Sequence, residues 1–267
     1  MTEIFQNIRQ LYFFSSPCPD LAEHIEFFSE SSPEATRDFT HGHNFSVKMF
    51  ASFTPTFWFN LGASYELQIG GRQYHVPAAK DILVVRDGII ERFNSPSDHI
   101  FSIKFFPGAL EAIFGIDQSK MINQPVDLAQ IMSSATINKI KEKKSFRDKV
   151  NFLEQYFLSE ISKKKKRDHY IRFVSDTIAV YESENMKYNL NELAEKLFTS
   201  SKTINRYFNR VIGTSPKNYF SIFRARVALT EYVADKKKFD PTVFGYYDSS
   251  HFYKEIHQFT DQRLSEI

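Results

Sequence analysis

Between residues 44 and 106 the chain is a series of short, largely apolar segments separated by turn signals. These segments are rich in β-branched and aromatic residues: NFSVKMFA (44–51), FWFN (57–60), SYELQI (64–69), RQYHV (72–76), DILVV (81–85), IIERF (89–93) and HIFSIKFF (99–106). Turn-forming pairs such as Gly70-Gly71 and Asp87-Gly88 separate them. Short strands at this close spacing predict a small β-barrel or β-sandwich.

After Pro107-Gly108 the apolar positions recur every three to four residues, which is the period of a helix. We predict helices at 109–115, 125–132 and 145–161, and a short amphipathic helix at 21–28. In the helix 145–161 one face is an apolar stripe made of Phe146, Val150, Leu153, Phe157 and Ile161. The stripe fits two interpretations: packing on the chain's own strands, or a dimer contact.

The run Lys163-Lys164-Lys165-Lys166-Arg167 divides the chain, because like charges repel one another and resist packing. The segment after this run has helical periodicity and no convincing strand. We therefore predict an α+β protein with two domains, consistent with its 267 residues. A β-rich barrel with trailing helices occupies 1–162, a basic linker 163–168, and an all-α domain 169–267.

The all-α segment contains the stretch NLNELAEKLFTSSKTINRYFNRVIG (189–213), which predicts two short helices joined by a sharp turn. Asn189 and Glu192 are spaced as a capping box for the first helix. Ile204, Phe208 and Val211 form the inner face of the second helix, so its outward residues are Ser201, Lys202, Asn205, Arg206 and Asn209. Arginine can bind guanine bidentately and asparagine can bind adenine in the same way. The helix is therefore suited to reading the major groove of DNA.

A second helix-turn-helix-like stretch is FGYYDSSHFYKEIHQFTDQ (244–262), in which Asp248 can cap a helix that starts at Ser249. Between the two stretches, PKNYFSIFRARVALTEYV (216–233) predicts an uninterrupted helix of about 27 Å. Successive major-groove faces of a duplex are about 34 Å apart. Such a helix could hold two reading heads in adjacent grooves.

Basic residues are concentrated around the first stretch, although the net charge of the chain is only +2. The window from Lys196 to Thr230 contains no Asp or Glu and includes Lys196, Lys202, Arg206, Arg210, Lys217, Arg224 and Arg226. A local cationic excess favours duplex binding, because each contact with a phosphate releases condensed counterions.

These residues resemble the DNA-binding domain of the AraC/XylS family of transcriptional regulators. The resemblance is carried by LAEKLFTSSKTINRYFNRVIGTSPKNYF (193–220), FRARVAL (223–229) and GYYDSSHF (245–252), in this order and spacing. FSIKFFPGALEAIFGI (101–116) also resembles a segment of the sensor-like domain of some members. The resemblance implies a sequence-specific DNA-binding transcription factor of bacterial type that acts through RNA polymerase and is not an enzyme.

Individual positions can be carried over from this resemblance. The first recognition helix corresponds to SKTINRYF, which implies contacts to bases or phosphates from Lys202, Thr203, Asn205 and Arg206. The second corresponds to DSSHFYKE, which implies Ser249, Ser250, His251 and Lys254. Pro241 departs from the family pattern, because it stands where the first helix of the second unit should run. We therefore expect the first unit to provide most of the base recognition.

Two other classes of protein match parts of the sequence, a metal-binding enzyme and a ligand-binding module. His41 and His43, with Glu66 and His75, resemble the ligand pattern of a metal-binding, cupin-like barrel, so the alternative is a cupin-like metal enzyme or ligand-binding protein with a helical accessory domain. The second cupin motif does not follow, and we expect no metal, no cofactor and no catalytic residue. The aromatic residues Phe53, Phe57, Trp58, Phe59 and Tyr65 could line an effector pocket, but in strands they more often form core.

The remaining composition fits an intracellular regulator. The single cysteine, Cys18, lies between prolines and predicts an inert loop thiol in a reducing cytoplasm. No signal peptide and no apolar run of about 18 residues is evident, so we expect no membrane partner. The expected partners are double-stranded DNA, RNA polymerase, a small-molecule effector and a second copy in a homodimer.

Overall fold

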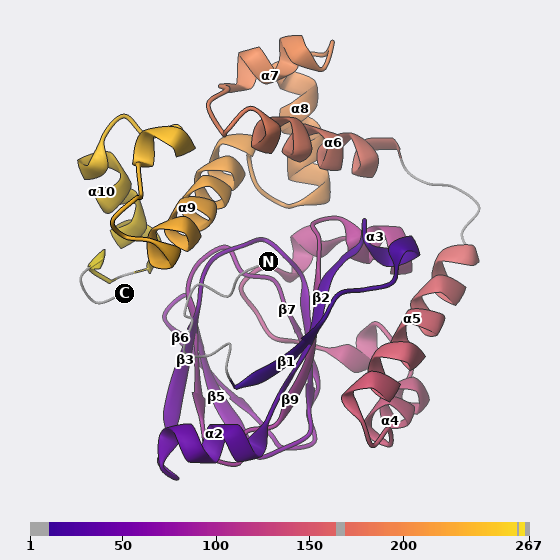
Figure 1. The fold of residues 1–267 in the computed structure, drawn as a ribbon. Coiled ribbons are helices and arrows are strands. Elements are labelled where there is room, and N and C mark those ends of the chain that lie inside the picture. The colour runs from indigo at the N-terminus through magenta and orange to yellow at the C-terminus, as the bar shows by residue number, and fades with distance from the viewer. Residues whose placement is uncertain (1–10, 164–168, 261, 265–267) are drawn as a thin grey trace.

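The computed structural model describes residues 11–163, 169–260 and 262–264 (Figure 1). All the strands precede residue 128, and only helices follow it. We call residues 11–163 the sheet half and residues 169–264 the helical half. Figure 1 shows the helices of the second half lying over one end of the sheets.

The sheet half contains two antiparallel sheets. The six-stranded sheet has the order β1 (Tyr12–Ser15), β2 (Ile25–Ser31), β9 (Ile100–Phe105), β4 (Thr56–Asn60), β7 (Ile82–Val84) and β10 (Val126–Asp127). The four-stranded sheet has the order β3 (Phe45–Met49), β8 (Ile90–Asn94), β5 (Tyr65–Ile69) and β6 (Arg72–Val76).

All seven strands predicted between residues 44 and 106 are present, and the prediction of a β-rich half followed by a helical half is confirmed. The predicted closed, cupin-like barrel is wrong in one respect. The strands form two sheets whose edge strands stay unjoined, β1 and β10 in one sheet and β3 and β6 in the other. The arrangement is therefore a sandwich.

Two predicted helices are wrong. Residues 21–28 form the end of a 3-10 turn (Pro19–Leu21) and then β2, which pairs with β1 on one side and β9 on the other. Pairing on both edges satisfies the backbone of β2 better than an isolated short helix would. Residues 125–132 form β10 and a 3-10 turn (Leu128–Gln130) that Asp127 caps through the amide of Ala129.

Successive side chains of a central strand face opposite sides of the sheet, so each central strand contributes to two different cores. In β4, Phe57 and Phe59 pack toward the helices of the sheet half, whereas Trp58 faces the other sheet. Because both faces are covered, every residue of β4 is buried. In β9 the same alternation turns Ser102 and Lys104 toward the space between the sheets.

The helices of the sheet half cover the outer face of the six-stranded sheet. They are α3 (Ala109–Phe114), the 3-10 helix η2 (Gln118–Met121), α4 (Ser134–Lys141) and α5 (Phe146–Ser162), and α2 (Pro33–Thr40) lies after β2. The predicted apolar stripe of α5 packs on the chain's own core, where Val150, Leu153 and Phe157 are buried. Ser145 caps the helix through the amide of Asp148.

The helical half comprises α6 (His169–Ser183), α7 (Leu190–Lys196), α8 (Ser201–Val211), α9 (Pro216–Ala234), the 3-10 helix η4 (Pro241–Phe244) and α10 (Ser249–Thr260). Of the predicted linker 163–168, only Lys163 belongs to the described residues, and it ends α5. The rest of the basic run lies outside the described residues.

The two halves pack closely against each other. Gly213, just after α8, has φ +91°, and a Cβ atom there would lie 2.7 Å from the Cδ1 atom of Ile122 in the sheet half. Gly108 has φ +84°, and its Cβ atom would lie 2.8 Å from Val211 of α8. Both positions need glycine for its backbone freedom and for its lack of a side chain.

An ion-pair chain also crosses between the halves. Glu26 lies at an irregularity of the β2–β9 register, where the pairing shifts between Ile25 and Phe27. Such a bulge re-aims a side chain. The Glu26 carboxylate contacts Lys104 of β9 at 3.3 Å and Arg226 of α9 at 3.2 Å.

Glu26 should make the stability of the protein sensitive to acid. Burial alone would raise the pKa of Glu26, but Lys104 and Arg226 outweigh it and hold the pKa below its ordinary value of 4.5. A lowered folded-state pKa stabilises the fold above the unfolded-state value, and this contribution is lost as pH falls through the folded-state pKa. We expect Glu26→Gln to lower the free energy of unfolding by about 1–3 kcal/mol at pH 7.

This difference between wild type and Glu26→Gln should shrink below about pH 4.5, the ordinary value. Urea unfolding measured from pH 7 to pH 3 tests it, with Glu23→Gln as an exposed control of the same chemistry. A difference that stays constant over this range would contradict the assignment.

Candidate nucleic-acid interface

The first predicted helix-turn-helix is present as α7 and α8. The Asn189–Glu192 capping box starts α7, and Ser200 caps α8 through the amide of Thr203. The turn between the helices contains Phe198 in the left-handed conformation (φ +50°), and its side chain is almost fully exposed. Ser201 Oγ donates to Asn191 Oδ1 at 2.7 Å, which fixes the start of α8 to α7.

One face of α8 is buried and the other carries the predicted contact residues. Ile204, Phe208 and Val211 are at most 1% exposed and belong to the core of the helical half. Lys202 and Arg206 are exposed, and Thr203 and Asn205 are half-buried. The predicted recognition positions of the first unit therefore share the outer side of one helix.

The polar side chains of this face bond to neighbouring groups of α8 and its cap, whereas the cations Lys202 and Arg206 stay exposed. The Asn205 side-chain amide donates to the carbonyl of Ser201 at 2.9 Å, and Thr203 Oγ1 lies 3.0 Å from Ser200 Oγ. The Arg206 guanidinium lies 4.9 Å from the ring centroid of Tyr207, which orients it on the helix surface.

The second unit is shortened, as Pro241 predicted. Its first helix is only the 3-10 helix η4, which Asp240 caps through the amide of Thr242. Proline is accepted there because it stands at the first helical position. Asp248 then accepts from the amide of His251 at 2.7 Å and starts α10.

The predicted contact residues of the second unit lie together on the outside of α10. Ser249, Ser250, His251 and Lys254 are all exposed, whereas Phe252 and Ile256 are buried. The exposed Tyr247 precedes them in the connecting turn. Sequence reasoning did not select Tyr247, and its exposure in the fold is the signal that identifies it.

A single helix, α9, joins the two units. Its 19 residues correspond to about 28 Å. Arg224 of α9 makes a two-point ion pair with Glu255 of α10, at 2.8 and 3.0 Å, and lies 4.4 Å from the ring centroid of Tyr246. This half-buried ion pair fixes the angle between α9 and α10.

The structure divides the predicted basic window into two groups. Four of its cations contact carboxylates: Lys196 with Glu184, Arg210 with Glu111 and Asp117, Arg224 with Glu255, and Arg226 with Glu26. Among the described residues, Lys202, Arg206 and Lys217 form no ion pair. The cations available to phosphates are therefore fewer than the sequence suggested, and two of them are on α8.

Arg210 is held by the sheet half. Glu111 of α3 accepts from Arg210 Nη2 at 2.6 Å and from the Tyr170 hydroxyl of α6 at 2.8 Å. The Arg210 guanidinium also lies 5.4 Å from the ring centroid of Tyr170. A long-range contact of this kind, 99 residues apart in the chain, leaves no pattern in the sequence.

A pocket opens between the two sheets, on the far side of β9 from the helices. It is lined by Tyr12, Phe14, Phe27, Ser29, Val47, Met49, Thr56, Trp58, Arg86, Arg92, Ile100, Ser102 and Lys104. Of the five aromatic residues proposed for a pocket, only Trp58 lines this one. Phe57 and Phe59 are core of the sheet half, and Phe53 is core of the helical half.

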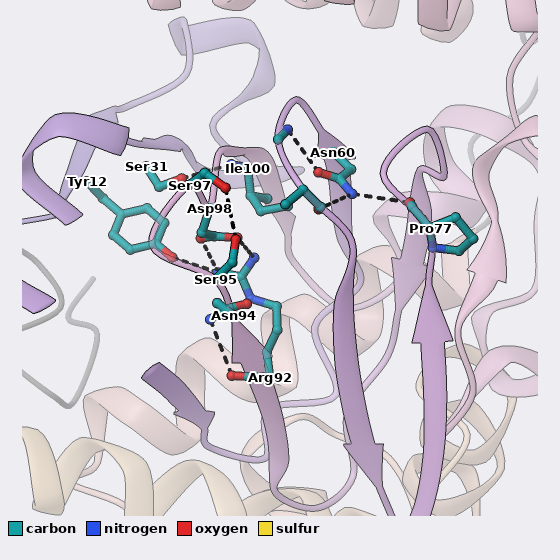
Figure 2. Close-up of polar contacts among 12 residues, drawn as sticks. Tyr12, Ser31, Asn60, Pro77, Arg92, Asn94, Ser95, Ser97, Asp98 and Ile100 are labelled. Atoms are coloured by element: carbon teal, nitrogen blue, oxygen red, sulfur yellow. Dashed lines mark hydrogen bonds and ion pairs between the residues drawn. The ribbon is translucent and has the colours of Figure 1, made fainter. Parts of the chain in front are cut away.

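Arg92, at the wall of this pocket, is bound by residues of the sheet half. Figure 2 shows its guanidinium at the Asp98 carboxylate, with two hydrogen bonds of 3.0 Å, and at the Tyr12 hydroxyl, also at 3.0 Å. Burial disfavours the charged guanidinium, but Asp98 and the nearby tyrosines outweigh it and raise the pKa of Arg92. Arg92 is therefore a permanent, neutralised cation in the sandwich.

The histidines considered as metal ligands do not gather. His75 pairs with Glu66 across β5 and β6 on the sheet surface, at 2.5 Å, and His41 ends α2 in a left-handed conformation. Within the described part of the chain, no group of three or more His, Cys, Asp or Glu side chains could hold a metal ion. Burial, followed by the charge of Glu154, raises the pKa of the Cys18 thiol, which keeps it protonated. Over the same residues, no helix is long and apolar enough to cross a membrane.

Comparison with known proteins gives structural neighbours only. No protein-family model and no curated protein matches the chain. A structure of ToxT from Vibrio cholerae is 11% identical with a TM-score of 0.49, covering 84% of this chain and 96% of that one. A ToxT structure with a bound unsaturated fatty acid has 11% identity and a TM-score of 0.48, over 84% and 92% of the two chains.

The AraC-like transcriptional activator CuxR has 12% identity and a TM-score of 0.31, covering 85% of this chain and 89% of its own. ToxT and CuxR are both regulators of the AraC/XylS family, the family that the C-terminal motifs of this chain resemble.

Proposed function

We propose that the protein is a transcriptional regulator that binds duplex DNA through the major groove, with α8 as its principal recognition helix. The observation that carries this proposal is the outer face of α8, where Lys202 and Arg206 are exposed and unopposed by carboxylates among the described residues. Asn205 lies between them on the same face. Arg and Asn are the side chains best suited to paired hydrogen bonds with guanine and adenine.

We propose a different role for each half of the chain. Residues 1–162 form a domain for sensing or dimerisation, 163–168 form a linker, and 169–267 form the DNA-binding domain. The action on transcription would require a contact with RNA polymerase, and the sheet half would provide the contact between two copies.

The second unit is proposed to contribute mainly phosphate contacts. Because η4 replaces a full first helix, α10 has less support for a fixed insertion into a groove. Its exposed hydroxyls at Ser249 and Ser250, with Lys254, suit contacts to the DNA backbone.

The pocket between the sheets is the proposed effector site. Its lining combines apolar side chains such as Val47 and Trp58 with the cations Arg86 and Lys104. A few polar groups in an apolar cleft are typical of small-molecule sites. The effector class that fits is a small amphipathic molecule with an anionic group.

A binding selection on genomic fragments with the full chain tests the DNA-binding function directly. We expect a sequence motif to be recovered, with affinity for the best fragment falling steeply as salt rises, since each phosphate contact contributes about −0.9 to the slope of log K against log salt. Enrichment of no fragment by the full chain or by residues 169–267 alone would refute the proposal.

Arg206→Ala should weaken binding to that fragment by about 1–3 kcal/mol and relax the preference at one base position. The cause is loss of a paired contact with a base edge. Lys139→Ala, which removes an exposed cation from α4 in the sheet half, is the control and should leave the affinity unchanged. Equal affinity and unchanged base preference in Arg206→Ala would exclude it from base recognition.

Octanoate should raise the thermal unfolding midpoint of the full chain, whereas octylamine, with the same apolar length and the opposite charge, should not. The physical reason is the pairing of an apolar wall with Arg86 and Lys104. Trp58→Leu keeps an apolar lining and tests the location of binding, because it should reduce the octanoate effect. A rise of equal size with octylamine would argue against an anion-selective pocket.

A further inference from the structure

The segment between β3 and β4, residues 50–55, lies between two residues that line the pocket and packs into the helical half. It passes from the four-stranded sheet to the six-stranded sheet, and the flanking residues Met49 and Thr56 both line the pocket. Phe50, Ala51 and Phe53 are buried in the core of the helical half. The Phe53 ring lies 6.3 Å from that of Tyr219 in α9. This segment is therefore a wedge of the sheet half inside the helical half.

Arg86 holds the wedge in place from the pocket side. Its backbone carbonyl accepts from the amides of Ser52 at 3.1 Å and Phe53 at 2.8 Å. Arg86 lines the pocket, and its guanidinium donates to Ser52 Oγ at 3.3 Å. Phe53 has φ +50°, a strained conformation for a bulky residue, so its position depends on these contacts.

Gln118 joins the other side of the wedge to the recognition helix. Its side chain is almost completely buried. Nε2 donates to the carbonyl of Phe53 at 3.1 Å and to that of Ile212, the residue that ends α8, at 3.4 Å. Oε1 accepts from the amide of Gly108 at 2.9 Å. One amide group thus fixes the wedge and the end of α8 to each other.

The other two cations that line the pocket, Arg92 and Lys104, contact residues outside α8. The contacts of Arg92 with Asp98 and Tyr12 stay within the sheet half, and Lys104 reaches α9 rather than α8, through Glu26 and Arg226. Arg86 has a continuous polar path to the end of α8, through Ser52, Phe53 and Gln118.

We propose that Arg86, the Ser52–Phe53 backbone and Gln118 form a mechanical connection that couples the wall of the pocket to the C-terminal end of α8. Arg86 and Gln118 are positioning residues for the recognition helix. The inference rests on the proposed function for the roles of the pocket and of α8, but the coupling itself can be measured without DNA or an effector.

Hydrogen exchange of the full chain, followed by mass spectrometry, is the test. The amides of Ile212 and Gly213, which donate to the Phe208 carbonyl, report on the last turn of α8. Gln118→Met should speed their exchange about three- to tenfold, the factor that corresponds to one net hydrogen bond. Arg86→Met and the milder Ser52→Ala should speed it in the same direction.

The double variants distinguish coupling from general loosening. If the path is continuous, adding Arg86→Met or Ser52→Ala to Gln118→Met should cause no further increase at Ile212 and Gly213. Ser102→Ala is the control, because Ser102 lines the same pocket and its hydroxyl bonds to that of Ser29 in β2, at 2.6 Å, within the sheet half. It should leave these amides unchanged.

Additive effects in the double variants, or no effect of Arg86→Met and Ser52→Ala on these amides, would overturn the proposal. If Arg86→Met fails to fold, the Ser52→Ala and Gln118→Met pair gives the same cycle. DNA affinity is measured separately in each variant. A wild-type chain that binds no DNA would remove the proposed function and leave the exchange result standing.

Discussion

The insertion of Phe50, Ala51 and Phe53 into the core of the helical half is the contact on which the rest of the arrangement depends. It makes the two halves share one apolar core instead of meeting at a polar surface. Closely packed cores transmit small displacements because they contain few voids. In the proposed coupling, a change in the sandwich would therefore reach the helices that carry the proposed recognition residues.

Ion pairs also connect the two halves. The sheet half supplies Glu26, Glu111 and Asp117, and these carboxylates hold arginines of α8 and α9. They leave the outer side of α8 to Lys202 and Arg206. Within the predicted basic window, only these two and Lys217 of α9 form no ion pair among the described residues, so the cations without a carboxylate partner are concentrated on α8. Arg210 and Arg226 instead form ion pairs with the sheet half, and Arg224 forms one with α10.

Local signals in the sequence were sufficient for much of the helical half. The Asn189–Glu192 capping box starts α7 as predicted, and Ser200 and Ser215-Pro216 start α8 and α9, because capping depends on residues only three positions apart. The same holds for Pro241, which shortened the second unit. The apolar periodicity of 201–211 also predicted that Lys202, Asn205 and Arg206 lie on the outer face of the helix, and the family resemblance added Thr203.

Local patterns in the chain were enough to predict the seven strands of 44–106, the helix pairs and the outward residues of α8, because each depends on periodicity or on neighbours a few positions away. Long-range pairing instead places residues 25–28 in strand β2, since the backbone of this strand pairs with β9, more than 70 residues later. The tertiary structure also decided that Phe53 belongs to the helical core and that Arg210 binds Glu111. Contacts between distant segments depend on how the halves pack, and that packing leaves no local pattern in the chain.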